Sequence, residues 1–243
     1  MENSKKCEKK NHTDYISVYP KVPDIKISNG KTYITNLKVL LAQNLYVGNN
    51  MIKLNDKFST LLNVPEPPIG WYISEKYDGI RAIWDGEKFI SRGQKVFTYV
   101  PEYFKKLMPP AIALDGEMWI SRNNFKEVSR ISNLKIGKSK SQVEIDKIWT
   151  GSDNTKSVKY MVYDIPNSTE PFEIRMKLLE KIINDRIHVW KEILKCIDDC
   201  PIKFTPQTKI NNMQQLVNTY KLLTSRGAEG VMLRAPNSPY ENK

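Results

Sequence analysis

The sequence predicts an α+β protein in which mainly antiparallel sheets are flanked by helices. Several short segments are rich in aromatic and β-branched residues, which is typical of strands. Two longer segments, residues 171–186 and 211–227, space their apolar residues as amphipathic helices do. Strands and helices follow one another without a regular strand–helix–strand alternation, and this order favours antiparallel over parallel sheets.

The first two predicted strands, residues 71–77 (WYISEKY) and 80–86 (IRAIWDG), consist largely of aromatic and β-branched residues. The second strand continues into a hairpin, because the pair Asp85–Gly86 favours a tight turn and another apolar run follows it. A proline at a first-turn position then opens a short helix over residues 101–108.

In the second half of the domain the sequence predicts strands over residues 111–120 and 159–165, and a final strand over residues 228–236. Pro171 opens the first long helix, and the second long helix ends at Gly227. The second helix carries an apolar stripe, which is the face expected to pack on a sheet. The stripe consists of Met213, Leu216, Val217, Tyr220 and Leu223.

The charge balance favours a polyanionic partner. Lys and Arg total 38 against 27 Asp and Glu, so the formal net charge is +11. Nucleic acid and an anionic membrane surface are the partner classes that such a balance favours, although charge also serves solubility alone. No apolar run approaches a membrane span, and the N-terminus lacks an apolar signal core. With three cysteines, an odd and sparse set, we expect an intracellular protein, in cytoplasm or nucleus.

The chain divides into two unequal parts. Residues 1–50 are expected to form a basic, partly flexible extension, because four of the first ten residues are lysine and Pro20 and Pro23 follow. Residues 51–243 carry the strand and helix signals, and are expected to form one domain.

One motif stands at the junction of the first two strands: ISEKYDGIRAIWDG, residues 73–86. Lys76 ends a strand, Asp78–Gly79 makes a turn, and Arg81 begins the return. Glycine permits a positive φ and close approach of a ligand to the backbone. Arginine offers a planar fork of donors to phosphate or ribose oxygens. A nucleophilic lysine must be neutral, a form that partial burial and nearby cations favour. The alternative is a surface lysine before a hairpin turn.

Four further positions indicate a functional site only when they are considered together. Arg92 in SRGQKVF could be a second anion-binding position, and Glu117 in LDGEMWI places a carboxylate within an apolar strand. Tyr163 lies in the apolar strand KYMVYDI, and Glu229 begins the strand EGVMLR. Taken singly, each is equally well explained by a solvated charge or by ordinary packing.

In this order the segments SEKYDGIRAIWDG, SR, LDGE, VKYMVYDIPNSTEPFEIR and EGVMLRAPNSPY closely resemble the ATP-dependent DNA ligases. These enzymes belong to the covalent nucleotidyltransferase superfamily, and the small, minimal ligases are the most similar in appearance. The resemblance runs from about residue 70 to the end of the chain. It implies a nucleotidyltransferase (ligase adenylation) fold.

The resemblance also implies roles for individual residues. Lys76 would be the nucleophile that becomes adenylated. Arg81 and Arg92 would hold ribose and phosphates, and Arg92 would also meet the 5′-phosphate of DNA. Tyr163 would stack on the adenine, since an aromatic face is a platform for a base.

The acidic residues would have two functions. Glu117 would contact the ribose or a metal ion, and Glu229 would coordinate Mg²⁺ or Mn²⁺, hard cations that prefer oxygen ligands. Many relatives carry an acid two residues before the lysine. Ser74 occupies that position here, and Glu75 is the nearest acid, which we take as the expected nucleotide contact.

The implied reaction joins a nick in double-stranded DNA through a lysine–AMP and a DNA–adenylate intermediate, with ATP as the nucleotide and a monomer as the active form. In the family a further strand with two lysines and an oligonucleotide-binding (OB) domain follow. This chain ends at Lys243, before both. Either the product is truncated or a partner supplies the rest. We expect a truncated product whose missing OB domain belongs in cis, and weak activity of the present fragment.

Two alternatives remain open. An RNA ligase or an mRNA-capping guanylyltransferase uses the same lysine chemistry, and comparison of ATP with GTP and of DNA with RNA separates them. A non-catalytic, basic nucleic-acid-binding protein is the alternative from another class. It predicts salt-sensitive DNA binding that the substitution Lys76→Ala leaves unchanged.

Overall fold

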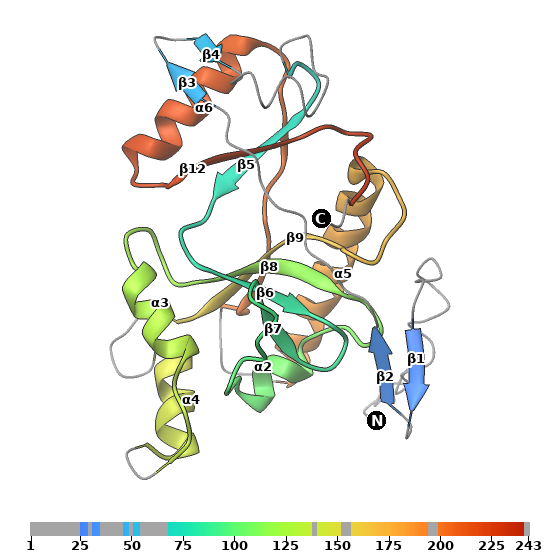
Figure 1. Ribbon diagram of the computed structural model, residues 1–243, viewed down its shortest axis with the longest axis vertical. Coiled ribbons are helices and arrows are strands. Elements are labelled where there is room, and N and C mark those ends of the chain that lie inside the picture. The colour runs from blue at the N-terminus through green and yellow to red at the C-terminus, as the bar shows by residue number, and fades with distance from the viewer. Residues whose placement is uncertain are drawn as a thin grey trace, which may run out of the picture.

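The computed structural model describes residues 25–28, 31–34, 46–48, 51–53, 68–137, 140–151, 157–193 and 199–240 (Figure 1). Of the predicted extension over residues 1–50, only three short strands fall within this description. No helix in the described part of the chain is both long and apolar enough to cross a membrane.

Twelve strands and five helices are named along the described segments. The strands are β1 (Ile25–Ser28), β2 (Lys31–Ile34), β3 (Tyr46–Gly48), β4 (Met51–Lys53), β5 (Tyr72–Lys76), β6 (Ile80–Trp84), β7 (Phe89–Ser91), β8 (Leu114–Trp119), β9 (Lys159–Asp164), β10 (Ile202–Phe204), β11 (Thr208–Lys209) and β12 (Gly230–Arg234). The helices are α2 (Glu102–Lys106), α3 (Phe125–Ser132), α4 (Gln142–Thr150), α5 (Phe172–Ile193) and α6 (Met213–Ser225).

Two sheets form the body of the protein. The larger has five strands in the order β10-β9-β8-β6-β7, and the smaller has three in the order β11-β5-β12. Every pairing in them is antiparallel except that of β10 with β9. Figure 1 shows the small sheet on one side of the large one, with α6 beyond it. The predicted α+β class with mainly antiparallel sheets is confirmed.

The main hydrophobic core covers one face of the large sheet, under α2, α4 and α5. Trp149 and Trp190 are the largest fully buried side chains in it, and Tyr160 and Phe89 meet edge to face at 5.1 Å between ring centroids. The Tyr160 hydroxyl contacts the carbonyl oxygens of Ala82 and Leu114 at 2.9 Å each. Because this face is filled, functional side chains of the sheet are confined to its other face.

A second, smaller core joins the small sheet to α6. Ile73 of β5 packs with Ile210 and with Leu216 of α6, all of them buried. The helix begins at Asn212, whose side chain accepts a hydrogen bond from the Gln215 amide, as an N-cap does. The predicted apolar stripe of this helix is confirmed, since its members are buried or half-buried.

The sequence prediction missed α3, α4, β10 and β11. Helix α4 does carry a sequence signal, a capping box in which Ser141 and Glu144 satisfy each other's backbone amides. It ends at Gly151, whose φ is 73°. The strands β10 and β11 have three and two residues, which is too short for a recognisable alternation.

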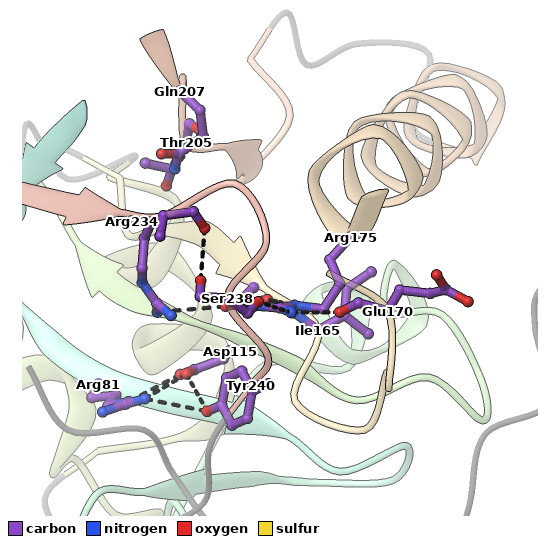
Figure 2. Close-up of polar contacts among 12 residues, drawn as sticks. Arg81, Asp115, Ile165, Glu170, Arg175, Thr205, Gln207, Arg234, Ser238 and Tyr240 are labelled. Carbon is purple, nitrogen blue, oxygen red and sulfur yellow. Dashed lines mark hydrogen bonds and ion pairs between the residues drawn. The ribbon is translucent and has the colours of Figure 1, made fainter. Parts of the chain in front are cut away.

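A buried ion pair connects the large sheet, α5 and the segment that follows β12. Arg175 of α5 is fully buried, and its Nε and Nη2 donate to the two carboxylate oxygens of Asp164 at 2.6 and 3.1 Å. Its Nη1 donates to the carbonyl oxygens of Glu170 and Ser238 at 2.6 and 3.0 Å. Arg234 of β12 adds a second cation 3.4 Å from Asp164 (Figure 2). Asp164 therefore fixes three separate parts of the chain.

We predict that Arg175→Met lowers the free energy of unfolding by about 3 to 5 kcal/mol, because the buried Asp164 carboxylate loses its nearest cation and keeps the Ile165 amide and the more distant Arg234. Urea denaturation measures the loss. Arg130→Met is the matched control, since Arg130 forms an exposed pair with Glu127 on α3 and should change stability by less than about 1 kcal/mol. Equal effects of the two substitutions would contradict the structural role of Arg175.

Candidate active site

The chain passes from the small sheet to the large sheet through residues 77–79, between β5 and β6. These strands do not pair, so Asp78–Gly79 is a crossing between sheets and not a hairpin turn. A Cβ atom on Gly79 would lie 2.4 Å from the Met118 carbonyl oxygen and 2.7 Å from Cγ of Glu117. Gly79 does not use the positive φ that a glycine permits. Glycine is required there because the crossing passes directly over β8.

The small sheet presents one face to the large sheet and the other to α6. On β5, Ile73 packs against α6, so alternation places Ser74 and Lys76 on the opposite face. In the register of β5 with β12, Met232 is the partner of Ser74 and Gly230 is the partner of Lys76. Lys76 therefore ends its strand on the face turned toward the large sheet.

The large sheet presents Arg81, Glu117 and Tyr163 on the face opposite its hydrophobic core. Their strand neighbours Ala82, Met118 and Val162 belong to that core, and alternation turns the three side chains to the other side. Arg81 and Glu117 are direct partners across β6 and β8. Lys76 on the small sheet thus faces Arg81, Glu117 and Tyr163 on the large sheet. We call the space between these two faces the cleft.

Lys76 and Glu229 form an ion pair in which the lysine Nζ donates to Oε1 of the glutamate. Glu229 immediately precedes Gly230, the partner of Lys76 in the β5–β12 register, so strand pairing brings the two side chains together. The side chains of Lys76 and Glu229 are 39% and 43% exposed. The pair therefore remains accessible to a ligand that enters the cleft.

Glu117 has a pKa raised to about 8. The main cause is burial, and the negative charges of Asp115 and Glu229 raise the pKa further, while Arg81 and Lys76 lower it. The charges of Lys76 and Glu229 act on Glu117 because residues from both sheets lie near one another. Because of this pKa, a large fraction of Glu117 is protonated at neutral pH.

Arg81 is held by a buried carboxylate that the sequence analysis did not single out. Its Nε and Nη2 donate to the oxygens of Asp115 at 3.0 and 2.5 Å, and Asp115 is fully buried. The Tyr240 hydroxyl donates to the same carboxylate at 2.7 Å and lies 3.4 Å from Arg81 Nη2 (Figure 2). Burial lowers the pKa of Arg81, but the bonds and charge of Asp115 outweigh it and raise the pKa overall.

Tyr163 lies close to the same charges. Burial raises the pKa of its phenol, and the charge of Asp115 raises the pKa further. The pairing of β8 with β9 shifts in register between Asp115 and Gly116, opposite Tyr163. Gly116 is needed at this irregularity, because a Cβ atom there would lie 2.6 Å from the Tyr160 ring. In the LDGE motif the glycine is therefore required for packing against Tyr160, Asp115 holds Arg81, and Glu117 lies on the face toward the cleft.

Two predicted site residues lie apart from this group. Glu75 alternates with Lys76 and accepts from Arg122 through both oxygens, at 2.8 and 2.7 Å. Arg92 follows Ser91, the partner of Ala82 at the end of β7, and its side chain is exposed. Arg92 thus stands at the rim of the large sheet, where a continuation of the β6–β7 register would place it opposite Arg81.

The carboxylates of the cleft fit a divalent cation that arrives with phosphate oxygens. Among the described residues, no group of three or more His, Cys, Asp and Glu side chains gathers as a metal site. Glu229 nevertheless lies close enough to Glu117 for its charge to raise the pKa of Glu117. Mg²⁺ commonly binds through one or two carboxylates together with substrate phosphates, so these two acids suit it.

Comparison with known proteins identifies the family. A family model described as an ATP dependent DNA ligase domain matches residues 53–243. A DNA ligase of Haemophilus influenzae is 32% identical over 179 residues, covering 73% of this chain and 56% of that protein. The chain therefore spans less than two thirds of the length of this relative.

Solved structures share the fold. One described as belonging to Lig E DNA ligases, with DNA binding by a minimal scaffold, has a TM-score of 0.58 and 24% identity over 73% of this chain and 60% of its own. A Chlorella virus DNA ligase-adenylate has a TM-score of 0.53 and 20% identity over 71% of this chain and 55% of its own. The fold, the ordered motifs and the family match agree, and this chain belongs to the family of ATP-dependent DNA ligase domains.

Proposed function

We propose that this chain is the adenylation domain of a DNA ligase and that Lys76 carries AMP covalently. The observation that supports this best is the cleft itself, in which Lys76 and Glu229 of the small sheet converge with Glu117 of the large sheet. A lysine beside acids in a cleft between two sheets is suited to nucleotidyl transfer and has no structural purpose that requires this placement.

In the first step, the Lys76–Glu229 ion pair opens and the ammonium group loses its proton to water, which leaves Glu229 as a carboxylate. The Nζ lone pair then forms a bond to the α-phosphorus of ATP. The bond from that phosphorus to the bridging oxygen breaks, and pyrophosphate leaves with the electron pair. Arg81 would stabilise the charge that develops on the phosphate oxygens.

In the later steps, a 5′-phosphate oxygen at a nick in double-stranded DNA attacks the lysine-bound phosphorus and restores the lysine. The 3′-hydroxyl then attacks the activated 5′-phosphate, the strand is sealed and AMP leaves. Arg92, exposed at the rim, is available to meet that 5′-phosphate. The net charge of +11 suits a grip on the DNA backbone that weakens as salt rises.

Glu117 and Glu229 would hold Mg²⁺ or Mn²⁺, and Tyr163 would stack on the adenine. A bound divalent cation supplies charge neutralisation at the phosphates. Binding requires Glu117 as a carboxylate, so the proton that it holds when its pKa is about 8 must be released. The OB domain in cis and the monomeric state are parts of the same proposal.

We predict that Lys76→Ala abolishes the covalent label that the chain takes from ATP labelled in its α-phosphate in the presence of Mg²⁺. Lys221→Ala is the matched control, because Lys221 is an exposed lysine of α6, and α6 packs on the face of the small sheet opposite the cleft. That variant should retain at least about half of the label. A label that survives in Lys76→Ala, or no label in the unaltered chain, would refute the proposal.

We predict that Glu117→Gln changes how stability depends on pH. A folded-state pKa of about 8, above the ordinary 4.5, means that the folded protein keeps a proton which the unfolded chain releases. The resulting contribution to stability is complete below about pH 4.5 and is lost as pH rises through about 8. Glutamine stays neutral, so the variant should be the more stable protein by about 1 to 3 kcal/mol at about pH 9.

Urea denaturation at about pH 6 and about pH 9 measures this difference. Glu180→Gln on the exposed side of α5 is the control, and its stability should follow that of the unaltered chain at both values. If Glu117→Gln follows it as well, Glu117 does not hold the proton.

A further inference from the structure

A second crossing between the two sheets lies at residues 205–207, between β10 and β11. Thr205 is tied to the large sheet, since its amide donates to the Val162 carbonyl oxygen at 2.8 Å, next to Tyr163. Thr208 is tied to the small sheet as the partner of Ile73 in β5. Gln207 therefore lies in the connection between β10 of the large sheet and β11 of the small sheet, at the edge of the cleft.

The register of the small sheet turns Gln207 toward the cleft. Thr208 is paired with Ile73, so the preceding position, 207, lies opposite Ser74. Met232 is the partner of Ser74 on its other side. Residues in one row across a sheet share a face, and Ser74 shares its face with Lys76. Figure 2 draws Gln207 and Thr205 together with Arg234, which lies two residues beyond Met232 on the same face.

Gln207 carries a buried acceptor that lacks a donor. Its Nε2 donates to the Thr205 carbonyl oxygen at 3.3 Å, which determines which end of the amide is the acceptor. Its Oε1 is buried and has no hydrogen-bond donor among the described residues. A buried acceptor without a donor is costly, and a ligand that donates a hydrogen bond to it would remove that cost.

We propose that Gln207 selects the base of the nucleotide, its Oε1 accepting a hydrogen bond from the exocyclic amine of adenine. This inference rests on the proposed function, in which the adenine ring lies on Tyr163. Adenine carries a donor at its 6-position. Guanine carries a carbonyl oxygen there, which would face the Gln207 oxygen as a second acceptor. The side-chain oxygen therefore favours ATP over GTP by attraction to one base and repulsion of the other.

The test compares nucleotide binding by calorimetry in chains that all carry Lys76→Ala, so that no covalent step occurs. The ligands are ATP, GTP and purine riboside triphosphate, which lacks the 6-amino group. Gln207→Met should weaken ATP binding about tenfold, the effect of one buried hydrogen bond, and should leave binding of purine riboside triphosphate unchanged. The preference for ATP over GTP should narrow accordingly.

Gln214→Met on the exposed side of α6 is the matched control and should change none of these affinities. Gln207→Met removes the unsatisfied acceptor together with the 3.3 Å hydrogen bond to the Thr205 carbonyl oxygen. Because these two effects oppose each other, the urea midpoint should change little, which separates lost recognition from lost folding. Equal weakening of ATP and purine riboside triphosphate, or no weakening of either, overturns the assignment, as does an absence of ATP binding in the Lys76→Ala chain.

The two proposals can fail separately. Covalent labelling at Lys76 without base dependence at Gln207 would leave the adenylation domain intact and refute the role of Gln207. Base-dependent ATP binding without any covalent label would support Gln207 and refute the lysine chemistry.

Discussion

The passage of the chain from one sheet to the other within residues 77–79 is the constraint on which the site depends. It places the last residue of β5, Lys76, and the second residue of β6, Arg81, on opposite sides of one cleft. The crossing is possible only because Gly79 lies against the backbone of β8 without a side chain. Any larger residue would push β8 away, and Glu117 with it, so the same glycine sets the distance between the nucleophile and its surrounding charges.

The segment after β12 holds the two sheets in this relation. The carbonyl oxygens of Pro236 and Ser238 accept from the first amides of α5, which would otherwise lack partners at the helix N-terminus. Tyr240 then reaches Asp115 in the large sheet, while Arg234 pairs with Asp164. A few residues thus connect the small sheet, α5 and the large sheet through buried charges, whose removal one at a time is costly although the intact set contributes modestly to stability.

The sequence predicted those features that local chemistry determines. Lys76, Glu117 and Glu229 lie at or near strands with strong aromatic and β-branched signals, and order along the chain sufficed to group them. Asp115 and Tyr240 escaped because their contact spans 125 positions and exists only in the folded chain. Asp115 belongs to the LDGE motif that the sequence analysis noted, but the sequence did not indicate that Arg81 and Tyr240 are its partners. Gln207 gave no local signal, because the feature that singles it out is a buried side-chain oxygen without a donor, which is seen only in the folded chain.

The cations of the cleft already have carboxylate partners: Lys76 has Glu229, Arg81 has Asp115 and Arg234 has Asp164. A polyphosphate that binds there must compete with these carboxylates. Its net gain is therefore smaller than the attraction between phosphate and cation alone. In return, the cations are desolvated and oriented during folding, so little reorganisation is left for the moment of reaction. Such a cleft favours a ligand with several charges and a matching base over a single phosphate. The larger ligand can replace more than one of these carboxylates at once, whereas a single phosphate cannot.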